Sequence, residues 1–273
     1  MIEDVVRPHG PYRLRLMTYG REYETPLPGG GRGRARQRPD GLVCLRAPDE
    51  EGLALLRFCL ALDADTTEFA QRFRRDPLLG PSIRSLHGLR PLRRPTVAHA
   101  LLRAICGQLI EARRAIAIER AIVRAIGEPA PTREAIGRLS PAELRRLGLA
   151  THRASTLVRV CRTIDLEGLR DLPLEAVEAR LLRERGLGPW SLGVIGLRGL
   201  GSYRYGLVGD LTLVKLCSAL WGRWVELYET AALLEPYEEW AGLAGVYLMH
   251  GWKRRLVPGA NADLARLVRC RAA

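Results

Sequence analysis

The sequence predicts an α+β fold that is mostly α-helical: a small N-terminal antiparallel sheet domain followed by an all-helical body. Three observations predict it. Short apolar runs of strand length occur before residue 48. From Asp49 onward, apolar residues recur at helical spacing. Proline or glycine separates nearly every helical segment from the next. We expect an N-terminal α/β domain at 1–94 and a helical region at 95–273.

Strands are predicted at two N-terminal segments. From Pro11 to Met17, tyrosine and leucine alternate with arginine, and Gly41 to Arg46 contains the apolar run LVCL. Between them, PLPGGGRGRARQRP has the composition of a loop. The arginines within residues 29–38 have the charge to contact phosphate, but we favour a solvated loop.

The helical segments follow in chain order. The Ser140-Pro141-Ala142-Glu143 sequence is typical of a capping box with proline at the first helical position. Helices are predicted at residues 50–62, 66–75, 96–107, 111–126, 141–148, 152–164, 174–184, 189–199, 211–221, 236–250 and 260–270.

Composition narrows the class of protein. Of 273 residues, 47% are hydrophobic and 27% charged, which excludes wholesale disorder. The sequence contains no apolar run long enough to span a membrane, and MIEDVVRPHG lacks the apolar core of a secretory signal. Lys and Arg number 43 against 30 acids, a net charge of +13. Nucleic acid is the first candidate partner, although an arginine-rich proteome would also produce such a charge.

Cysteine and lysine usage excludes several chemistries. The six cysteines are far apart and fit neither zinc nor iron–sulfur spacing, so we expect no metal requirement and no cofactor. All cations but Lys215 and Lys253 are arginines. Covalent catalysis through a Schiff base therefore has few amines to use. Walker, zinc-protease, serine-hydrolase and Rossmann motifs are absent from the sequence.

A glycine-rich turn between helices is the first candidate site. Gly186-Leu187-Gly188 follows one predicted helix, and Pro189 begins the next. Glycines permit a tight turn and close backbone approach, and the unpaired amides that open a helix bind anions such as a DNA phosphate. The same sequence is also compatible with a simple interhelical turn.

Asp210 is the second candidate. It follows Val208-Gly209 and precedes the apolar helix LTLVKLCSAL, so it is first of all an N-cap. A helix N-terminus also favours the negative charge of a carboxylate. Beside a DNA-binding turn, such a carboxylate has the chemistry to stabilise an oxocarbenium-like sugar and to orient a water molecule.

Together these residues resemble the helix–hairpin–helix–Gly/Pro–Asp superfamily of DNA glycosylases, and within it 3-methyladenine DNA glycosylase II. Leu102–Leu109 (LRAICGQL), Ser140–Ala154 and Trp240–Trp252 extend the resemblance over roughly residues 50–270. The resemblance implies a monomeric enzyme of base-excision repair that binds duplex DNA with a damaged base. It also implies a cytoplasmic, nucleoid-associated protein.

The resemblance assigns roles residue by residue. Asp210 matches the catalytic aspartate, and Gly186, Gly188 and Pro189 match the hairpin that holds phosphate. Gln108 and Leu109 match the turn that enters the minor groove, where an apolar wedge replaces the extruded base. A core leucine at a helix end is the alternative for Leu109. In the family, hairpin carbonyls often hold a monovalent cation, which implies a Na or K site at 183–188.

Trp190 occupies the position at which strand-cleaving members carry lysine. Tryptophan forms no Schiff base, so the resemblance implies hydrolysis of the base without strand cleavage. Lys215 is the nearby amine, and we expect it to contact phosphate. The indole face also suits a cationic alkylated purine, although Trp190 as a core aromatic is the alternative.

The remaining pocket positions depart from the family pattern. The resemblance places Val194 and Met249 where aromatic residues are expected, with Tyr247 nearby on another helix face. A less aromatic pocket leaves the lesion open: 8-oxoguanine, hypoxanthine and uracil are alternatives to alkylated purines. A noncatalytic protein that binds damaged DNA and an RNA-binding protein are the rivals outside this enzyme class.

Overall fold

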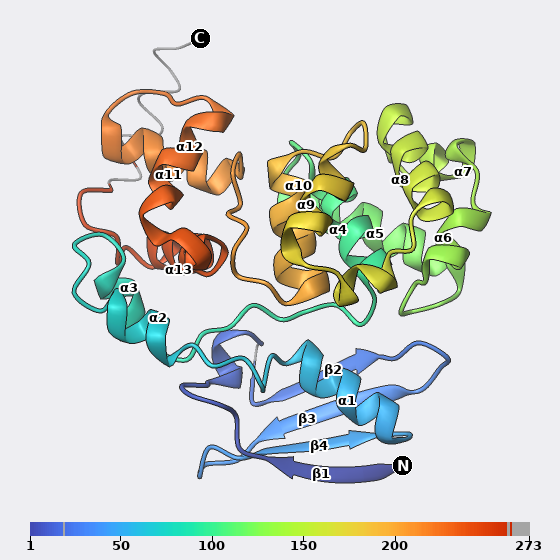
Figure 1. Ribbon diagram of the computed structural model, residues 1–273, viewed down its shortest axis with the longest axis horizontal. Coiled ribbons are helices and arrows are strands. Elements are labelled where there is room, and N and C mark those ends of the chain that lie inside the picture. The colour runs from blue at the N-terminus through green and yellow to red at the C-terminus, as the bar shows by residue number, and fades with distance from the viewer. Residues whose placement is uncertain (19, 261–262, 264–273) are drawn as a thin grey trace.

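The computed structural model describes residues 1–18, 20–260 and 263 of the 273-residue chain. Figure 1 shows the sheet at one end of the molecule, with two groups of helices side by side above it. One group contains α4 to α10, and the other contains α11 to α13. The predicted α+β class, mostly helical with an N-terminal antiparallel sheet, is confirmed.

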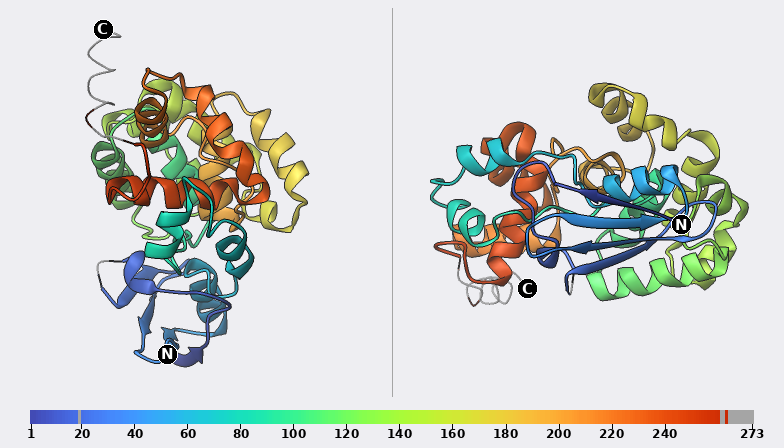
Figure 2. Two further views of the ribbon diagram at one scale, coloured as in Figure 1. Left: turned by 90° about the vertical axis from the view of Figure 1, so that its left-hand side faces the viewer. Right: turned by 90° about the horizontal axis from the view of Figure 1, so that it is seen from below.

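The sheet has four antiparallel strands in the spatial order β1-β4-β3-β2. The view from below in Figure 2 looks onto this sheet. Helix α1 (Glu50–Cys59) packs against it through buried Leu53 and Leu56, and Asp49 caps the helix by accepting from the Gly52 amide at 2.8 Å. The strands are β1 (Ile2–Val6), β2 (Glu22–Pro26), β3 (Arg32–Gln37) and β4 (Val43–Ala47).

Two predictions about this domain were wrong. Residues 11–17 form no strand but contain a 3-10 turn at Leu14–Leu16, because the Gln37 side chain accepts from the Leu14 amide at 2.9 Å and pins the turn against the sheet. The expected loop at 29–38 contains strand β3, whose arginines face outward. Its inner face consists of Gly33 and Ala35, because a side chain at Gly33 would lie 3.1 Å from Leu56.

The helical body follows the predicted order with local differences. The predicted 189–199 helix divides into an α-helix and the π turn Gly196–Leu200, and Glu235–Trp240 is a 3-10 segment. Helices α3, α6 and α12 were not predicted, and nearly all of the predicted 260–270 helix lies outside the described residues. The Ser140 capping box is confirmed. The helices are α2 (Thr67–Arg72), α3 (Gly80–Ser85), α4 (Val97–Gly107), α5 (Ala112–Ile126), α6 (Arg133–Arg138), α7 (Pro141–Arg146), α8 (Thr151–Thr163), α9 (Leu174–Leu182), α10 (Pro189–Ile195), α11 (Leu211–Trp221), α12 (Thr230–Leu234) and α13 (Ala241–Lys253).

Two hydrophobic cores support this arrangement. One lies between the sheet and α1 and ends at Leu62, and the other begins at Phe69 and runs through the helical body. Buried Arg90 donates to the carbonyls of Ala61 at 2.6 Å and Pro11 at 2.8 Å, which ties the N-terminal segment to the following chain. The domain boundary at residue 94 stays a prediction. Within the described ranges, no helix has the length and apolarity needed to cross a membrane.

Candidate active site

A cleft of about 850 Å³ brings most of the predicted site residues together. Its walls come from the turn between α4 and α5, from the hairpin before α10, and from the residues around the start of α11. The lining includes Asp210, Trp190, Gln108, Leu109, Gly186, Gly188, Pro189 and Lys215.

Asp210 is held at the N-terminus of α11 by two neutral donors. Its Oδ1 accepts from the Thr212 amide at 2.8 Å, the N-cap contact predicted from the sequence. Its Oδ2 accepts from the indole Nε1 of Trp190 at 3.2 Å. Gly209, with φ +85°, provides the left-handed turn that brings the carboxylate to the cleft. The side chain is half-buried, so it is fixed and still accessible.

The Trp190 indole reaches Asp210 because Gly107 leaves room for it. A Cβ atom at Gly107 would lie 2.6 Å from Cη2 of Trp190. The end of α4 therefore requires glycine where it meets α10. Sequence analysis missed both this contact and the Trp190–Asp210 hydrogen bond. The glycine of the Gly-Gln-Leu turn was the available signal.

Residues 107–109, here called the wedge turn, are joined to the hairpin by Gln108. Its Nε2 donates to the Gly186 carbonyl at 2.8 Å and to the Ser191 hydroxyl at 3.1 Å. Leu109 is 61% exposed and has φ +50°, a backbone conformation that leucine rarely adopts. The structure thus directs Gln108 into the protein and exposes Leu109 at the cleft.

The two hairpin glycines serve different requirements. Gly186 has φ +92°, and a Cβ there would lie 2.5 Å from Thr156 Oγ1, so the protein's own packing requires glycine. A Cβ at Gly188 would meet nothing within 4 Å. Pro189 begins α10, and Gly188 supplies no side-chain cap to the helix amides. The space outside Gly188 is therefore open for an external group to approach the backbone.

The hairpin carbonyls already accept hydrogen bonds within the protein. The Arg185 carbonyl accepts from Arg159 Nη2 at 2.7 Å, and the Glu184 carbonyl accepts from the Leu187 amide at 2.9 Å. Arg159 also pairs with the Glu184 carboxylate. A cation at this turn would lie near the positive charge of the Arg159 guanidinium. The cation at 183–188 stays a prediction.

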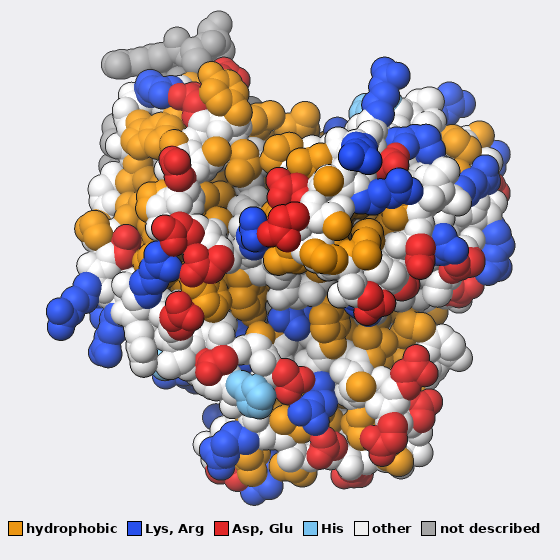
Figure 3. Space-filling view, in the orientation of Figure 1, with side chains coloured by type: hydrophobic (Ala, Val, Ile, Leu, Met, Phe, Trp, Pro, Cys, Tyr) orange, Lys and Arg blue, Asp and Glu red, His pale blue; other side chains and the backbone are white. Residues whose placement is uncertain are grey.

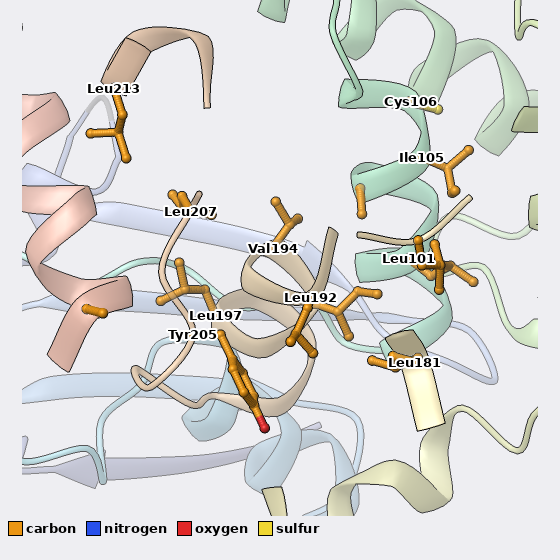
Figure 4. Close-up of a cluster of buried hydrophobic side chains, with 14 of the residues drawn as sticks. Leu101, Ile105, Cys106, Leu181, Leu192, Val194, Leu197, Tyr205, Leu207 and Leu213 are labelled. Carbon is orange, nitrogen blue, oxygen red and sulfur yellow. The ribbon is translucent and has the colours of Figure 1, made fainter. Parts of the chain in front are cut away.

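Three predicted pocket residues do not line this cleft. Val194 is 6% exposed and lies among buried apolar side chains beside Leu207 (Figure 4). Tyr247 is 2% exposed and packs against Phe69 at 5.3 Å between ring centroids, and burial raises the pKa of its hydroxyl. Met249 is half-buried against the same core. Helices α10 and α13 are apolar on several faces. The spacing of apolar residues therefore could not predict which face of each helix lies nearest the cleft.

Cations outnumber acids along the cleft. Its lining contains four cationic side chains and His152, against the carboxylates of Asp210 and Glu111. Arg103 donates to Glu119 at 3.2 Å. The other three cations (Arg113, Arg153 and Lys215) have no carboxylate within ion-pair distance among the described residues. In the view of Figure 3, Lys and Arg side chains also gather over the group of helices that contains α6 to α8. The cleft therefore suits a polyanion.

Comparison with known proteins agrees with this architecture. A DNA-3-methyladenine glycosylase of Bacillus subtilis (strain 168) is 26% identical over 204 residues, covering 68% of this chain and 67% of that protein. The solved 3-methyladenine DNA-glycosylase from Archaeoglobus fulgidus superposes with a TM-score of 0.78 at 18% identity, covering 92% of this chain and 98% of that chain.

A second enzyme type shares the fold. The 8-oxoguanine glycosylase/lyase of Clostridium acetobutylicum, in complex with double-stranded DNA containing cytosine opposite 8-oxoG, superposes with a TM-score of 0.72 at 16% identity. The match covers 94% of this chain and 99% of that chain. No protein-family model matches the chain. The sequence relative, the shared fold and the hairpin–aspartate geometry all agree with the resemblance of this chain to the helix–hairpin–helix DNA glycosylase superfamily.

Proposed function

We propose that this chain is a monofunctional DNA glycosylase of base-excision repair that hydrolyses alkylated purines of the 3-methyladenine type from duplex DNA, acting as a monomer. The carrying observation is the Asp210 carboxylate, held by Trp190 and by its own helix in a cleft that also presents the hairpin and Leu109. The names of the Bacillus subtilis and Archaeoglobus fulgidus proteins support this lesion class.

DNA binding begins at the hairpin and at the unpaired cations. The amides that follow Gly188 bind a phosphate, and Lys215 contributes charge from α11. Leu109 enters the base stack and fills the space of the extruded nucleotide. The damaged nucleotide then enters the cleft beside Asp210.

Asp210 acts on the sugar. As the bond between C1′ and the base nitrogen breaks, its electron pair moves to the base, which leaves neutral because alkylation had made it cationic. The carboxylate stabilises the positive charge that develops on the sugar and orients a water molecule toward C1′. The water loses a proton to the carboxylate as the new C–O bond forms. The indole face of Trp190 attracts the cationic base by roughly 0.5–2 kcal/mol.

Strand cleavage would need an amine that attacks C1′. Tryptophan at position 190 supplies none, and of the two lysines only Lys215 lines the cleft. Its place on the exposed face of α11 suits a phosphate contact. The proposed product is an intact strand with an abasic site.

A glycosylase for a neutral lesion is the second candidate. The observation that favours it is the excess of cations around the cleft, since like charge disfavours a cationic base. The Clostridium acetobutylicum 8-oxoguanine enzyme shows that the fold is used for a neutral base. Parallel excision of methylated purines, 8-oxoguanine, hypoxanthine and uracil separates the two candidates.

The decisive experiment measures base release from methylated duplex DNA by the wild type and by Asp210→Asn. We expect free methylpurine, strand breaks only after alkali, and a roughly 10²- to 10⁴-fold slower reaction for the variant. Asn keeps the N-cap acceptor, and Asp49→Asn, at the N-cap of α1, is the matched control. Full activity of a folded Asp210→Asn enzyme would disprove the role of this carboxylate, and breaks without alkali would disprove the monofunctional mechanism.

A further inference from the structure

The cleft carries one aromatic side chain that the chemistry above does not use. Tyr228 lies in the short 3-10 turn Leu227–Glu229 and lines the same cleft as Asp210. Its side chain is 73% exposed, and the described residues offer its hydroxyl no hydrogen bond. An exposed aromatic ring contributes no burial free energy to folding. Its exposure at the cleft therefore indicates contact with a ligand.

The turn that carries Tyr228 is anchored directly to the Asp210 turn. The hydroxyl of buried Thr230 accepts from the Gly209 amide at 2.7 Å and donates to the Leu227 carbonyl at 2.7 Å. The Glu229 carboxylate accepts from the Glu226 amide at 2.6 Å and from Arg223 Nη1 at 3.1 Å. The backbone below the exposed ring is therefore fixed relative to Asp210.

The neighbours of Tyr228 combine apolar surface with positive charge. Leu109, Leu211 and Leu227 are also among the exposed large apolar residues, and all three line this cleft. Lys215 and Arg113 line it without a carboxylate partner among the described residues. Apolar or aromatic faces between unpaired cations are typical of surfaces that bind bases and phosphates together.

We propose that Tyr228 is a DNA-contacting residue whose ring stacks on a base of the bound DNA at the lip of the cleft. The turn that carries Tyr228 lies between α11 and α12 in the chain, whereas Leu109 lies in the turn between α4 and α5, and these helices belong to the two different groups of Figure 1. Stacking uses the ring face and needs no hydroxyl partner. The inference rests on the proposed function only in taking DNA as the ligand.

The test is equilibrium binding to a duplex with a tetrahydrofuran abasic site, using Tyr228→Ala, Tyr228→Phe and the control Trp221→Ala. Trp221 is an exposed aromatic on the same group of helices but lies outside this cleft. We expect roughly 5- to 100-fold weaker binding by Tyr228→Ala, and wild-type affinity for the other two. The slope of log affinity against log salt stays unchanged for Tyr228→Ala, whereas it falls by about 0.9 for Lys215→Ala.

A second readout locates the stacked base. We place 2-aminopurine 5′, 3′ and opposite to the abasic site, and expect wild type and Tyr228→Phe to quench one of the three positions more than Tyr228→Ala does. Binding by Tyr228→Ala within twofold of wild type would overturn the proposal, and so would a Phe variant as weak as Ala. No step depends on base release, so an enzyme that binds but releases no base would contradict only the proposed function.

Discussion

The sheet and the cleft both carry clustered arginines, but they neutralise them differently. On the sheet, Arg32 and Arg34 both pair with Glu24, and Arg46 pairs with Glu3 at 2.9 Å. In the cleft, Arg113 and Lys215 have no carboxylate partner within the described part of the chain. The net charge of +13 thus does not distinguish the two regions, whereas the pairing of their cations does.

The carboxylates of the two regions differ in the same way as the cations do. Each sheet carboxylate named above lies beside a guanidinium, while Asp210 is held by an indole and a backbone amide. Neutral donors fix the carboxylate without cancelling its charge. That charge remains available for the role we propose, which is to stabilise a positive sugar in the transition state.

The largest effect on stability is expected at Glu119, a buried carboxylate that pairs with Arg94 and Arg103. Burial raises the pKa of Glu119, but the hydrogen bond from His99 and the charges of Arg94 and Arg103 outweigh it and lower the pKa to about 2. The folded-state pKa lies below the ordinary 4.5, so this stabilisation is present above pH 4.5 and is lost as pH falls toward 2. We expect Glu119→Gln to lower the free energy of unfolding by on the order of 3 kcal/mol at pH 7.

Urea unfolding of wild type and Glu119→Gln from pH 7 to pH 3 measures this loss. The difference between the two proteins should shrink below pH 4.5, because the wild-type carboxyl then takes up its proton on unfolding. The subtraction cancels only groups that titrate alike in both proteins. His99 is not one of them, because burial lowers its pKa while Glu119 raises it, so the same comparison is repeated with His99→Gln in both proteins. A constant difference across the range would contradict the assignment.

The second effect tests the comparison of arginines directly. Arg113→Ala with Lys215→Ala removes two unpaired cleft cations, and Arg34→Ala with Arg36→Ala removes two paired sheet cations. We expect the first pair to weaken DNA binding by about 2 kcal/mol, roughly 30-fold, and to lower the salt slope by about 1.8. The second pair of substitutions lowers the net charge by the same amount and serves as the control. Equal losses of DNA affinity from both pairs would contradict the distinction between paired and unpaired cations.

The third effect concerns the neutral partner of Asp210. Trp190→Phe keeps an aromatic ring but removes the donor to the carboxylate. We expect single-turnover excision to slow by about 1.5 kcal/mol, roughly tenfold. Excision at the wild-type rate under saturating enzyme, with weaker binding of the damaged DNA, would assign Trp190 to base binding alone.

The smallest effect is expected at the sheet surface. Glu24 accepts from Arg34 at 2.9 Å, and Arg34 is itself well exposed. Exposed pairs of this kind are screened by solvent and contribute little. Glu24→Gln should leave the urea midpoint unchanged. A measurable shift at low salt that disappears at high salt would show that the sheet pairs contribute more than their exposure implies.

Sequence periodicity predicted the helical body well and the sheet poorly, for a physical reason. The inner face of β3 is Gly33 and Ala35, so its alternation has no large apolar residue to reveal it. The apolar segment 11–17 has strand composition, yet a contact from Gln37, distant in sequence, makes it a turn. Tertiary packing decides such short segments.

The candidate site shows the same limit. The hairpin glycines and Asp210 were identified because their turn chemistry is local, and the structure places them in one cleft. The faces of α10 and α13 depend on how buried helices pack, which left Val194 and Met249 away from the cleft lining. Gly107 and Tyr228 were missed because their importance lies in contacts between segments distant in sequence.

Gln108 fixes the spacing between two parts of the proposed DNA-binding surface. Its amide joins the wedge turn to the hairpin and so holds Leu109 at a fixed distance from the amides that follow Gly188. Phosphates repeat at regular intervals along a strand, so holding one phosphate places Leu109 against one base step. In the proposed function, the enzyme would inspect DNA in whole-nucleotide steps, and each step would require the hairpin and Leu109 to release the DNA together.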